Sequence, residues 1–417
     1  MSTPDIDLLV VGAGMAGLTA GAVAARGGAR VMVVDAAPAY GGNAALSGGQ
    51  FWTARNHDAM AEHNPGGDRV LGQVLLDTYP AVLEWIRGTG IEVGGRAEVL
   101  HGLGHPIDIL GYLHRCRAAI ESRSGWIVVG SRAAELLLGA DGVVSGAWIK
   151  DADGDRSAAE ASWTLLATGG FQADVGLRKR HLGPNEILLR SNPFSRGDGL
   201  RLGLAAGATT AGRADAFYGH LIAEPAADFG PADFQRLAMK FSPDGILLNL
   251  RGTRFTDESA DHLNNQEVAR QPEGRAVLVV DSRVRERNAT LIADAHARGA
   301  HVVCAAELED LAGPLGSWGY DGDTAVKSLR DKRGWGAGGP PWWAIEVRAA
   351  VTFTNFGLRV DEDGRVQRAG GPVPGLLAAG ADMGGVYAGG YAGGLSLAGV
   401  FGYRAAKFVL AGLSSVE

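Results

Sequence analysis

The beginning of the chain contains two continuous apolar runs that flank a stretch of small residues. The runs are residues 7–11 (DLLVV) and 30–34, and the second is followed by Asp35. Continuous apolar runs of this length are typical of parallel strands that are buried on both faces of a sheet. Between them, the alanine-rich residues up to about 25 predict a helix. The pattern therefore predicts a strand–helix–strand unit.

Later segments predict further strands and a last helix. Residues 51–124 are predicted to be helical, with an amphipathic stretch at 80–86. A final helix is expected from the end of a glycine-dense loop, 380–394, to about residue 412. Strands bounded by glycine turns are predicted at 126–129, 133–138, 143–150, 162–167, 351–354, 358–360 and 376–379.

The middle of the chain differs in character from both ends. Residues 212–345 carry more charge, contain the Trp-rich stretch 318–343 and lack a glycine fingerprint. We therefore expect one nucleotide-binding domain, built from 1–211 and 346–417, with a capping or substrate domain, 212–345, inserted between its two parts. The predicted fold class is α/β, a Rossmann-type domain with an inserted α+β cap.

Composition and charge exclude several classes of protein. Hydrophobic residues make up 46% and charged residues 20%, as in a globular protein, and the net charge of −7 gives no basic excess for binding nucleic acid. Two cysteines, Cys116 and Cys304, cannot form a disulfide framework and favour a reducing compartment. Residues 8–25 carry no charge, but they follow Asp5 and Asp7 and are interrupted by glycines, so we expect a cytoplasmic protein without a transmembrane segment.

The small residues after the first strand form the sequence G-x-G-x-x-G, at Gly12, Gly14 and Gly17. The first glycine permits a tight turn, the second lets the backbone approach a pyrophosphate, and the third lets the helix pack against the strand. The N-terminus of the helix offers N–H groups and a positive dipole end to phosphates. Asp35 can accept hydrogen bonds from a ribose. The unit therefore predicts dinucleotide binding.

Several motifs together resemble the flavoprotein family of fumarate reductase and succinate dehydrogenase, to which 3-ketosteroid dehydrogenases and tricarballylate dehydrogenase also belong. They are VVGAGMAGLTA (10–20) with Asp35, GGNAALSGG (41–49), LATGGF (166–171), GDGLRLGLAAGA (197–208), GTRFTDE (252–258) and PGLLAAGADMGG (374–385). The resemblance covers nearly the whole chain. It implies a glutathione-reductase-like domain that binds FAD, and chemistry at a carbon–carbon bond beside a carbonyl or carboxylate.

The resemblance also implies which residues contact FAD. No histidine occurs in 41–49, where members with covalent FAD carry one, so we expect non-covalent FAD. Asp382 stands where the family usually has a glutamate on the ribityl chain, and Ser396 and Leu397 would follow the flavin at the start of the last helix, whose dipole stabilises a reduced flavin. The implied set is Gly12, Gly14, Ala16, Gly17, Asp35, Ala36, Gly42, Asn43, Ser47, Gly48, Gly49, Ala133, Thr168, Gly169, Asp198, Gly380, Asp382, Ser396 and Leu397.

The chain departs from the fumarate-reducing members at the substrate residues. Their catalytic arginine falls at His262, and their second arginine falls at Tyr391. Their substrate histidine and threonine fall at Phe353 and Thr354, whereas the position of another substrate histidine is kept as His220. A dicarboxylate would lack its cationic partners there, and burying an unpaired carboxylate is strongly disfavoured.

Tyr391 and Gly394 instead resemble the ketosteroid dehydrogenase arrangement, in which a tyrosine hydroxyl and a backbone N–H hold a ketone oxygen. The resemblance implies desaturation: a base removes the α-proton, the β-hydrogen leaves as hydride to the flavin, and two donors stabilise the developing enolate charge. Tyr218 and His262 are the candidate bases, and His220 has either a ligand or a structural role.

Other interpretations remain open. The chain could reduce an enoate in the fumarate reductase manner, oxidise a carboxylate substrate in the tricarballylate manner, or carry FAD without catalysis. Each active form needs a small carbonyl or carboxylate substrate and an external electron acceptor or donor, such as dioxygen, a quinone or a redox protein. His101 and His105 lie among glycines and not on a helix, so no metal site is predicted.

Overall fold

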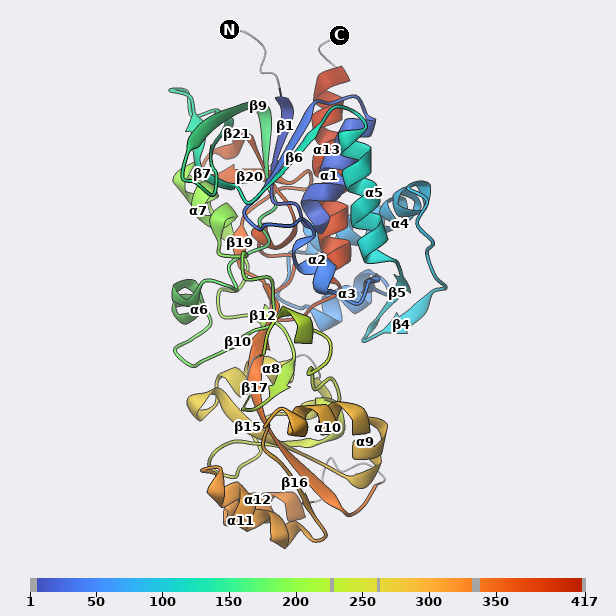
Figure 1. Ribbon diagram of the computed structural model, residues 1–417, viewed down its shortest axis with the longest axis vertical. Coiled ribbons are helices and arrows are strands. Elements are labelled where there is room, and N and C mark those ends of the chain that lie inside the picture. The colour runs from blue at the N-terminus through green and yellow to red at the C-terminus, as the bar shows by residue number, and fades with distance from the viewer. Residues whose placement is uncertain (1–5, 226–228, 261–262, 332–337, 415–417) are drawn as a thin grey trace. The chain divides into compact units, whose positions relative to one another are not determined.

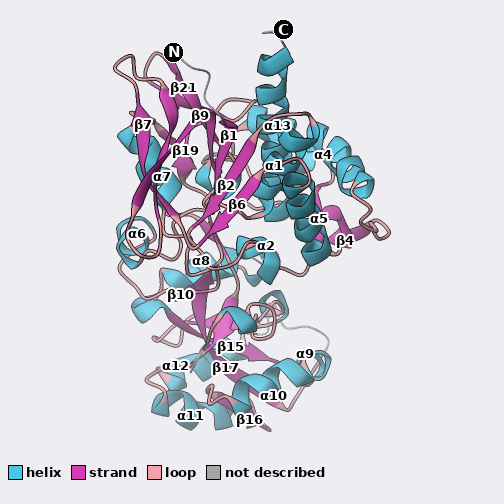
Figure 2. Cartoon of the chain, turned by 45° about the horizontal axis from the view of Figure 1, so that its top comes forward, coloured by secondary structure: helices cyan, strands magenta, loops and turns pink. Residues whose placement is uncertain are grey.

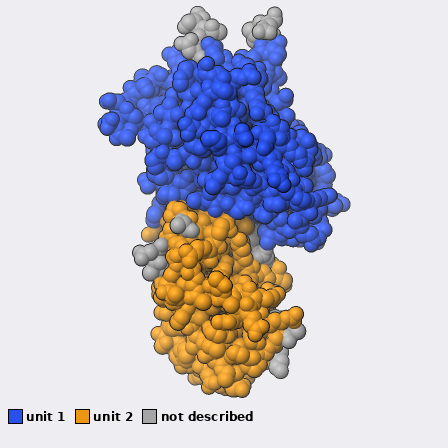
Figure 3. All heavy atoms as spheres, turned by 45° about the vertical axis from the view of Figure 1, so that its right-hand side comes forward, with its two compact units in different colours: residues 1–177, 192–216, 353–417 blue, residues 178–191, 217–352 orange. Residues whose placement is uncertain are grey.

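The computed structural model describes residues 6–225, 229–260, 263–331 and 338–414. By their contacts the residues form two compact units, which are shown in two colours in Figure 3. The first unit contains 1–177, 192–216 and 353–417, and the second contains 178–191 and 217–352. The sequence placed the divisions at 211/212 and 345/346 and assigned 178–191 to the nucleotide domain, whereas in the structure this segment belongs to the second unit.

The first unit is built on an eight-stranded sheet (Figure 1). Its strands run in the order β20-β21-β9-β1-β2-β6, with β8 on β9 and β7 on β8. From β21 to β6 neighbouring strands are parallel, while β20, β7 and β8 pair antiparallel. The strands are β1 (Ile6–Val11), β2 (Val31–Asp35), β6 (Trp126–Val129), β7 (Arg132–Leu138), β8 (Val144–Lys150), β9 (Arg156–Leu166), β20 (Arg365–Arg368) and β21 (Gly371–Ala378).

Helix α1 (Met15–Arg26) packs between α5 (Ile109–Glu121) and α13 (Gly394–Ser414), and α4 (Arg69–Gly88) packs on α13. Small residues permit this close packing. A Cβ atom on Gly402 of α13 would lie 2.3 Å from the carbonyl oxygen of Ala16 in α1. Figure 2 shows these helices grouped together beside the sheet. The strand–helix–strand unit and the last helix were thus predicted close to their observed bounds.

The helical prediction for 51–124 was wrong in part. Besides α3 (His57–His63), α4 and α5, the region contributes to a three-stranded antiparallel sheet of β3 (Gln50–Ala54), β4 (Ala97–Val99) and β5 (Gly102–Pro106). Glycines account for the difference, because a Cβ on Gly104 would lie 2.3 Å from the Cβ of Trp52 in β3. Because Gly104 has no side chain, β5 can pair with β3 next to the Trp52 side chain.

The remaining elements of the first unit are short. They are α2 (Gly42–Leu46), α7 (Asp198–Ala205), the antiparallel pair β11 (Thr210–Ala211) and β19 (Gly357–Leu358), and β18 (Phe353–Thr354). Helix α6 (Val175–His181) begins in the first unit and ends in the second.

The second unit is organised around one long strand, β17 (Trp342–Val351). On it pair β15 (Arg275–Val280), β13 (Leu221–Ala223) and β16 (Val302–Ala305), all antiparallel, and β10 (Leu188–Leu189), parallel. β14 (Ile246–Leu248) pairs with β15, and apolar side chains cover both faces of the sheet. The unit also holds β12 (Phe217–Tyr218) and the helices α8 (Leu263–Ala269), α9 (Ser282–Arg287), α10 (Ala289–Ala297), α11 (Ala312–Ser317) and α12 (Gly322–Arg330).

Within the residues that the structure describes, no helix combines the length and the apolar character needed to cross a bilayer.

Candidate functional site

The loops that carry the predicted cofactor residues follow the carboxyl ends of the parallel strands. Gly12 follows β1 with φ of +114°, and a Cβ there would lie 2.2 Å from the carbonyl oxygen of Ala167, which follows β9. A Cβ on Gly17 would lie 1.8 Å from the carbonyl oxygen of Gly12. In contrast, no atom lies within 4 Å of a Cβ built on Gly14, the residue before α1. Two glycines thus permit contact between backbone segments, and the middle one faces open space.

The second glycine loop lies against the first. A Cβ on Gly42 (φ +52°) would lie 3.4 Å from the Cα of Gly14. Asn43 follows Gly42, and its side-chain oxygen accepts a hydrogen bond from the backbone N–H of Asn192 at 2.6 Å. Ser47 Oγ donates to the carbonyl oxygen of Ala44 at 2.7 Å. The fold therefore brings two separate glycine motifs to one edge of the sheet.

The loop residues Gly48 and Gly49 differ in their surroundings. Gly48 is exposed, whereas Gly49 is buried and a Cβ on it would lie 2.3 Å from the carbonyl oxygen of Ile107. The requirement for glycine at 49 thus comes from the protein's own backbone, while Gly48 remains accessible.

The carboxylate of Asp35 closes the turn at the end of β2. Its two oxygens accept the backbone N–H groups of Ala13 at 2.6 Å and of Ala37 at 2.7 Å, while Ala36 lies between Asp35 and Ala37. Burial raises the pKa of Asp35 against the effect of these hydrogen bonds, and the negative charge of Asp198 raises it further. Asp35 and Asp198, from β2 and α7, therefore belong to one electrostatic group.

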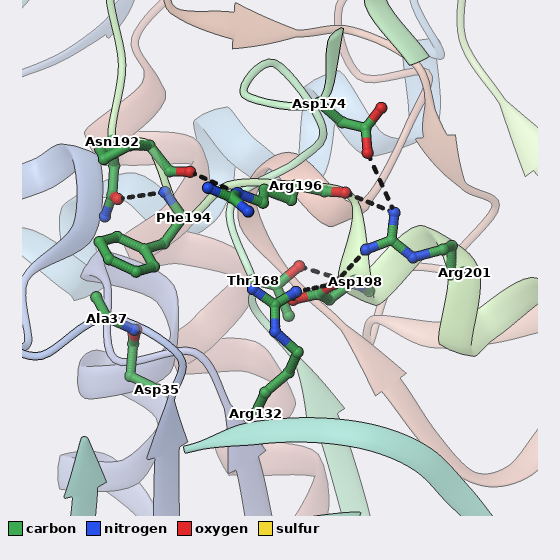
Figure 4. A network of polar contacts seen from close by, with 12 residues as sticks. Asp35, Ala37, Arg132, Thr168, Asp174, Asn192, Phe194, Arg196, Asp198 and Arg201 are labelled. Carbon is green, nitrogen blue, oxygen red and sulfur yellow. Dashed lines mark hydrogen bonds and ion pairs between the residues drawn. The ribbon is translucent and has the colours of Figure 1, made fainter. Parts of the chain in front are cut away.

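Asp198, at the start of α7, is held between two arginines (Figure 4). Arg132 Nη1 donates to both of its carboxylate oxygens, at 2.6 and 2.5 Å, and Arg201 Nη2 donates to the first of them. Arg201 also forms an ion pair of 3.7 Å with Asp174. Beside this network lies a cavity of about 620 Å³, lined by Ala133 and neighbouring residues of β7 and by α7.

A second buried carboxylate, Asp382, joins the loops after β9 and β21. It accepts the backbone N–H of Thr168 at 2.5 Å, the Thr168 hydroxyl at 2.9 Å and the backbone N–H of Gly170 at 3.0 Å. Burial raises the pKa of Asp382 to about 6, although these hydrogen bonds oppose the shift. Between its partners, Gly169 has φ of +88°. Asp382 thus acts as a link between loops in this structure.

The loop after β21 also reaches the start of α1. A Cβ on Gly380 would lie 3.3 Å from the Cβ of Ala16. Residues from both ends of the chain therefore share the edge of the sheet to which the glycine motifs belong.

The hydroxyl of Tyr391 lies at the N-terminus of α13. The backbone N–H of Gly394, the first residue of that helix, donates to this hydroxyl at 2.6 Å. Two residues on, Ser396 Oγ donates to the carbonyl oxygen of Trp52 at 2.5 Å, and the next residue, Leu397, is buried. The two groups predicted to hold a ketone oxygen are thus adjacent, at the positive end of a helix dipole.

Aromatic rings surround Tyr391 on several sides. Its ring centroid lies 5.9 Å from Trp52, 5.8 Å from Phe353 and 5.4 Å from Tyr387. The Tyr387 hydroxyl donates to the carbonyl oxygen of Gly393 at 3.0 Å, and burial raises the pKa of Tyr387 well above its ordinary value. Tyr387 is therefore a neutral donor that fixes the backbone just before α13.

Asn64 holds the tyrosine loop from outside. Its side-chain N–H donates to the carbonyl oxygen of Val386 at 2.6 Å, and its side-chain oxygen accepts the N–H of Ala388 at 2.8 Å. These two bonds flank Tyr387. The sequence reasoning missed both Asn64 and Tyr387. The only available signal was the turn sequence at 64–67, Asn-Pro-Gly-Gly, whose partner lies more than 300 residues away.

In the second unit, Tyr218 and His220 form a pair. The Tyr218 hydroxyl and His220 Nε2 are 3.0 Å apart, and His220 is buried. The carbonyl oxygen of Tyr218 accepts the backbone N–H of Thr352 at 2.8 Å. His262, the other candidate base, lies outside the described residues. Phe353, which stands where the reductases have a histidine, packs on Tyr391, and Thr354, which keeps their threonine, is fully buried.

His101 and His105 have separate surroundings. The ring of His101 stacks on His63, with centroids 4.2 Å apart, and meets Trp52 edge-on at 5.6 Å. His105 Nδ1 bonds to the carbonyl oxygen of Gly94 at 2.9 Å. Across the described part of the chain, no three His, Cys, Asp or Glu side chains come together in a way that could hold a metal ion.

The residues at the sheet edge fit FAD. Open space at Gly14, beside an N-terminus of α1 that no side chain caps, suits a pyrophosphate. The half-buried Asp35, the buried Asp198 and the cavity beside Ala133 suit the adenosine half. The N-terminus of α13 suits the electron-rich end of a flavin ring.

Comparisons with known proteins agree with FAD as the cofactor. The family model for the FAD binding domain matches residues 7–78 and 96–397. The 4-oxocyclohexanecarboxylate 2-dehydrogenase of Sinomonas cyclohexanicum is 25% identical, over 93% of this chain and 89% of that protein. The fumarate reductase (cytochrome) of Shewanella frigidimarina is 26% identical, over 97% of this chain and 77% of that protein.

Among solved structures, the 3-ketosteroid Δ1-dehydrogenase of Sterolibacterium denitrificans superposes with a TM-score of 0.79, at 19% identity, over 98% of this chain and 99% of that one. This likeness shows the fold. The resemblance, the fold class and the FAD cofactor predicted from the sequence are therefore confirmed.

Proposed function

The chain belongs to the FAD binding domain family and is an FAD-dependent oxidoreductase acting on CH–CH bonds, and from that premise we propose that it desaturates a cyclic ketone beside its carbonyl group. The observation that carries the proposal is the 2.6 Å contact between the Tyr391 hydroxyl and the Gly394 N–H at the start of α13. In that contact the Gly394 N–H donates to the Tyr391 oxygen, so a ketone oxygen that takes the place of this bond would meet two donors, the N–H and the phenol O–H, beside a helix N-terminus, where negative charge is stabilised.

In the proposed reaction the ketone oxygen replaces the hydrogen bond between the Gly394 N–H and the Tyr391 oxygen, and it accepts hydrogen bonds from both groups. That position is supported by Tyr387, which fixes the carbonyl group of Gly393, and by Ser396, which bonds the backbone of β3. Loss of the α-proton shifts electron density onto the ketone oxygen, where the two donors stabilise it. Bound FAD would supply the acceptor for the β-hydrogen and its two electrons, and their loss would leave a carbon–carbon double bond in the substrate.

The α-proton goes to one of the residues that the sequence singled out. Tyr218 and His220 form a hydrogen-bonded pair, in which the imidazole accepts the phenol proton as the phenol takes up the substrate proton. His262 is the alternative. The pair is the better supported of the two, because a tyrosine needs a partner of this kind to act as a base near neutral pH.

The 4-oxocyclohexanecarboxylate dehydrogenase supports the choice of a ring ketone, because the alignment covers most of both proteins. We propose that FAD is held without a covalent bond and that the reduced enzyme passes its electrons to an external acceptor. Reduction of an α,β-unsaturated carboxylate is the second candidate, supported by the fumarate reductase relative.

The test is an anaerobic titration of the purified holoenzyme. Cyclohexanone, 4-oxocyclohexanecarboxylate, a 3-ketosteroid and succinate are added in turn while the absorbance of the oxidised flavin is recorded. Bleaching by a ketone supports desaturation. If ketones leave the flavin oxidised and only an enoate reoxidises the dithionite-reduced enzyme, the second candidate replaces the first. Flavin that stays with the protein after acid precipitation would contradict non-covalent binding.

A further inference from the structure

The cavity between β7 and α7 lies entirely within the first unit, and its volume is about 620 Å³. Its walls combine charged and apolar side chains. The charged ones include Arg132, Asp198 and Arg201, and the apolar ones include Leu136, Leu138 and Leu202. A mostly apolar cavity with a few fixed polar groups suits a flat heterocyclic ring better than it suits a phosphate.

The cavity adjoins the turn that carries Asp35. The backbone N–H of Gly130 donates to the carbonyl oxygen of Ala37 at 2.7 Å, and the N–H of Ser131 donates to that of Asp35 at 2.9 Å. Arg132 follows directly on these two residues. Asp35 stands where the dinucleotide fold binds a ribose. Because adenine is attached directly to that ribose in FAD, the base would reach the cavity beside Arg132.

The guanidinium of Arg132 is held in a fixed orientation. Its Nη1 donates to both carboxylate oxygens of Asp198, which is buried (Figure 4). Arg201 holds Asp198 from the other side and is itself bonded, through Nη1, to the carbonyl oxygen of Arg196 at 2.7 Å. The Arg132 side chain remains 36% exposed, so part of its surface is open to a ligand in the cavity.

We propose that the guanidinium of Arg132 stacks on the adenine base of FAD in this cavity, and that this contact makes the protein select FAD over FMN. A guanidinium is planar and weakly hydrated, and it stacks on aromatic faces. The ion pair with Asp198 uses the N–H groups at the edge of that plane, so it orients the cation and leaves its face for the base. The inference concerns the cofactor and does not depend on which substrate is oxidised.

The experiment measures ligand binding to the full-length apoprotein by calorimetry. FAD and ADP both carry the adenosine half, whereas FMN carries the flavin with one phosphate. We expect Arg132→Gln to weaken the binding of FAD and of ADP by the same factor, roughly 5- to 30-fold, as for the loss of a desolvated cation–π contact. The affinity for FMN should change less than about twofold, and the wild type should bind FAD more tightly than FMN.

A second variant distinguishes stacking from charge. Arg132→Lys keeps a cation for Asp198 but lacks the flat guanidinium, so its affinities for FAD and ADP should fall nearly as far as those of Arg132→Gln. Arg156→Gln is the matched control. Arg156 also pairs with a carboxylate, that of Glu135 at 2.9 Å, and lies over an aromatic ring, that of Trp148 at 5.4 Å. This control should bind all three ligands as the wild type does.

Each result decides between the alternatives. Wild-type affinity of Arg132→Lys for FAD and ADP would show that only the charge matters, and would overturn the stacking. Equal losses for FMN and FAD, or a wild-type protein without preference for FAD, would overturn the selection. Arg201 still pairs with Asp198 in both variants of Arg132, so the buried carboxylate keeps a cation. The melting temperature of each apoprotein verifies the fold, and Arg132→Lys carries the test if Arg132→Gln is unstable. No ketone is used, so the outcome is independent of the desaturation.

Discussion

The edge of the sheet in the first unit is built mainly from backbone, whereas the polar cluster of the second unit, Tyr218 and His220, is built from side chains. At the sheet edge, the missing side chain of Gly12 lets two backbone segments come into contact, and those of Gly14 and Gly42 leave the backbone of the two loops bare. In the cluster, the side chains of Tyr218 and His220 form a hydrogen-bonded pair, to which we assign proton transfer in the proposed reaction. A binding surface made of backbone tolerates few substitutions, and it recognises a ligand only by its shape and its phosphate groups. Side chains at a site can be exchanged for others while the fold stays the same.

The largest effect is expected from substitutions of glycines at the sheet edge of the first unit. Gly12→Ala places a Cβ 2.2 Å from the carbonyl oxygen of Ala167 at a φ of +114°, so we expect no folded protein with FAD. Gly14→Ala meets no atom within 4 Å, so the apoprotein should keep its melting temperature while FAD binding weakens by about 100-fold or more. Thermal melting and flavin titration measure both.

Gly88→Ala is the matched control for this pair, because nothing lies within 4 Å of a Cβ there either and the residue ends α4. Wild-type FAD affinity in Gly14→Ala would show that the open space is not the pyrophosphate position.

The next effect tests the side-chain chemistry that the first unit contributes. Tyr391→Phe removes one of two donors and should lower kcat for a ketone by roughly 100- to 1,000-fold, the usual effect of losing an oxyanion donor. FAD content should not change, because the backbone-built surface is intact. Stopped-flow reduction of the flavin gives the rate. A variant that reduces its flavin at the wild-type rate would contradict the role of Tyr391.

A pH effect on stability is expected from Asp382. Its pKa of about 6 in the folded protein is above the ordinary value of 3.8, so the folded state holds the proton more tightly than the unfolded state does. This group therefore stabilises the protein fully below pH 3.8, and the contribution of up to about 3 kcal/mol is lost as the pH rises through 6.

The measurement is the free energy of unfolding of the apoprotein between pH 4 and pH 8, compared with Asp382→Asn. The variant should be less stable overall, because an amide N–H would face the N–H of Thr168 or Gly170, and it should lack the fall between about pH 4 and 6. The same slope in both proteins would assign that fall to another group.

The smallest expected effect concerns the support of the tyrosine loop. Asn64→Leu leaves the carbonyl group of Val386 and the N–H of Ala388 without their partner. We expect kcat to fall about 10-fold with KM for a ketone changed less, because the Tyr391 hydroxyl is displaced from the Gly394 N–H. Asn56→Ala removes the N-cap of α3, costs about 1 kcal/mol of stability, and should leave kcat unchanged. Equal effects of the two variants on kcat would make Asn64 a purely structural residue.

Sequence reasoning was most successful where the backbone determines the structure. The glycine spacing at 12–17 and the apolar runs around it identified the nucleotide fold, because these local patterns have few alternative conformations. The same reasoning was wrong in part for 51–124. There β3 pairs with β5, whose glycines leave room for the close approach of the two strands, and glycine is not a residue that predicts a strand.

Within the candidate site, Tyr391 and Gly394 were identified from a short motif, and the structure places them in contact. Asn64 was not identified, since its partners Val386 and Ala388 lie more than 300 residues away in the sequence. Tyr387 was not identified either, because its hydrogen bond to Gly393 depends on how the loop before α13 is folded. Contacts of this kind depend on the tertiary fold, and the local pattern of hydrophobic and polar residues does not predict them.

The link between Asp382 and Thr168 joins residues 214 positions apart, and β21 pairs with β9 over a similar separation. During synthesis, the loops after β1 and β9 therefore leave the ribosome long before the segment that completes their edge of the sheet. Most strand pairs of the second unit can form while the ribosome still holds the C-terminal segment, because they need nothing beyond β17. The cofactor pocket is thus a late product of translation, and a chain that stops before residue 382 would leave the two loops unjoined.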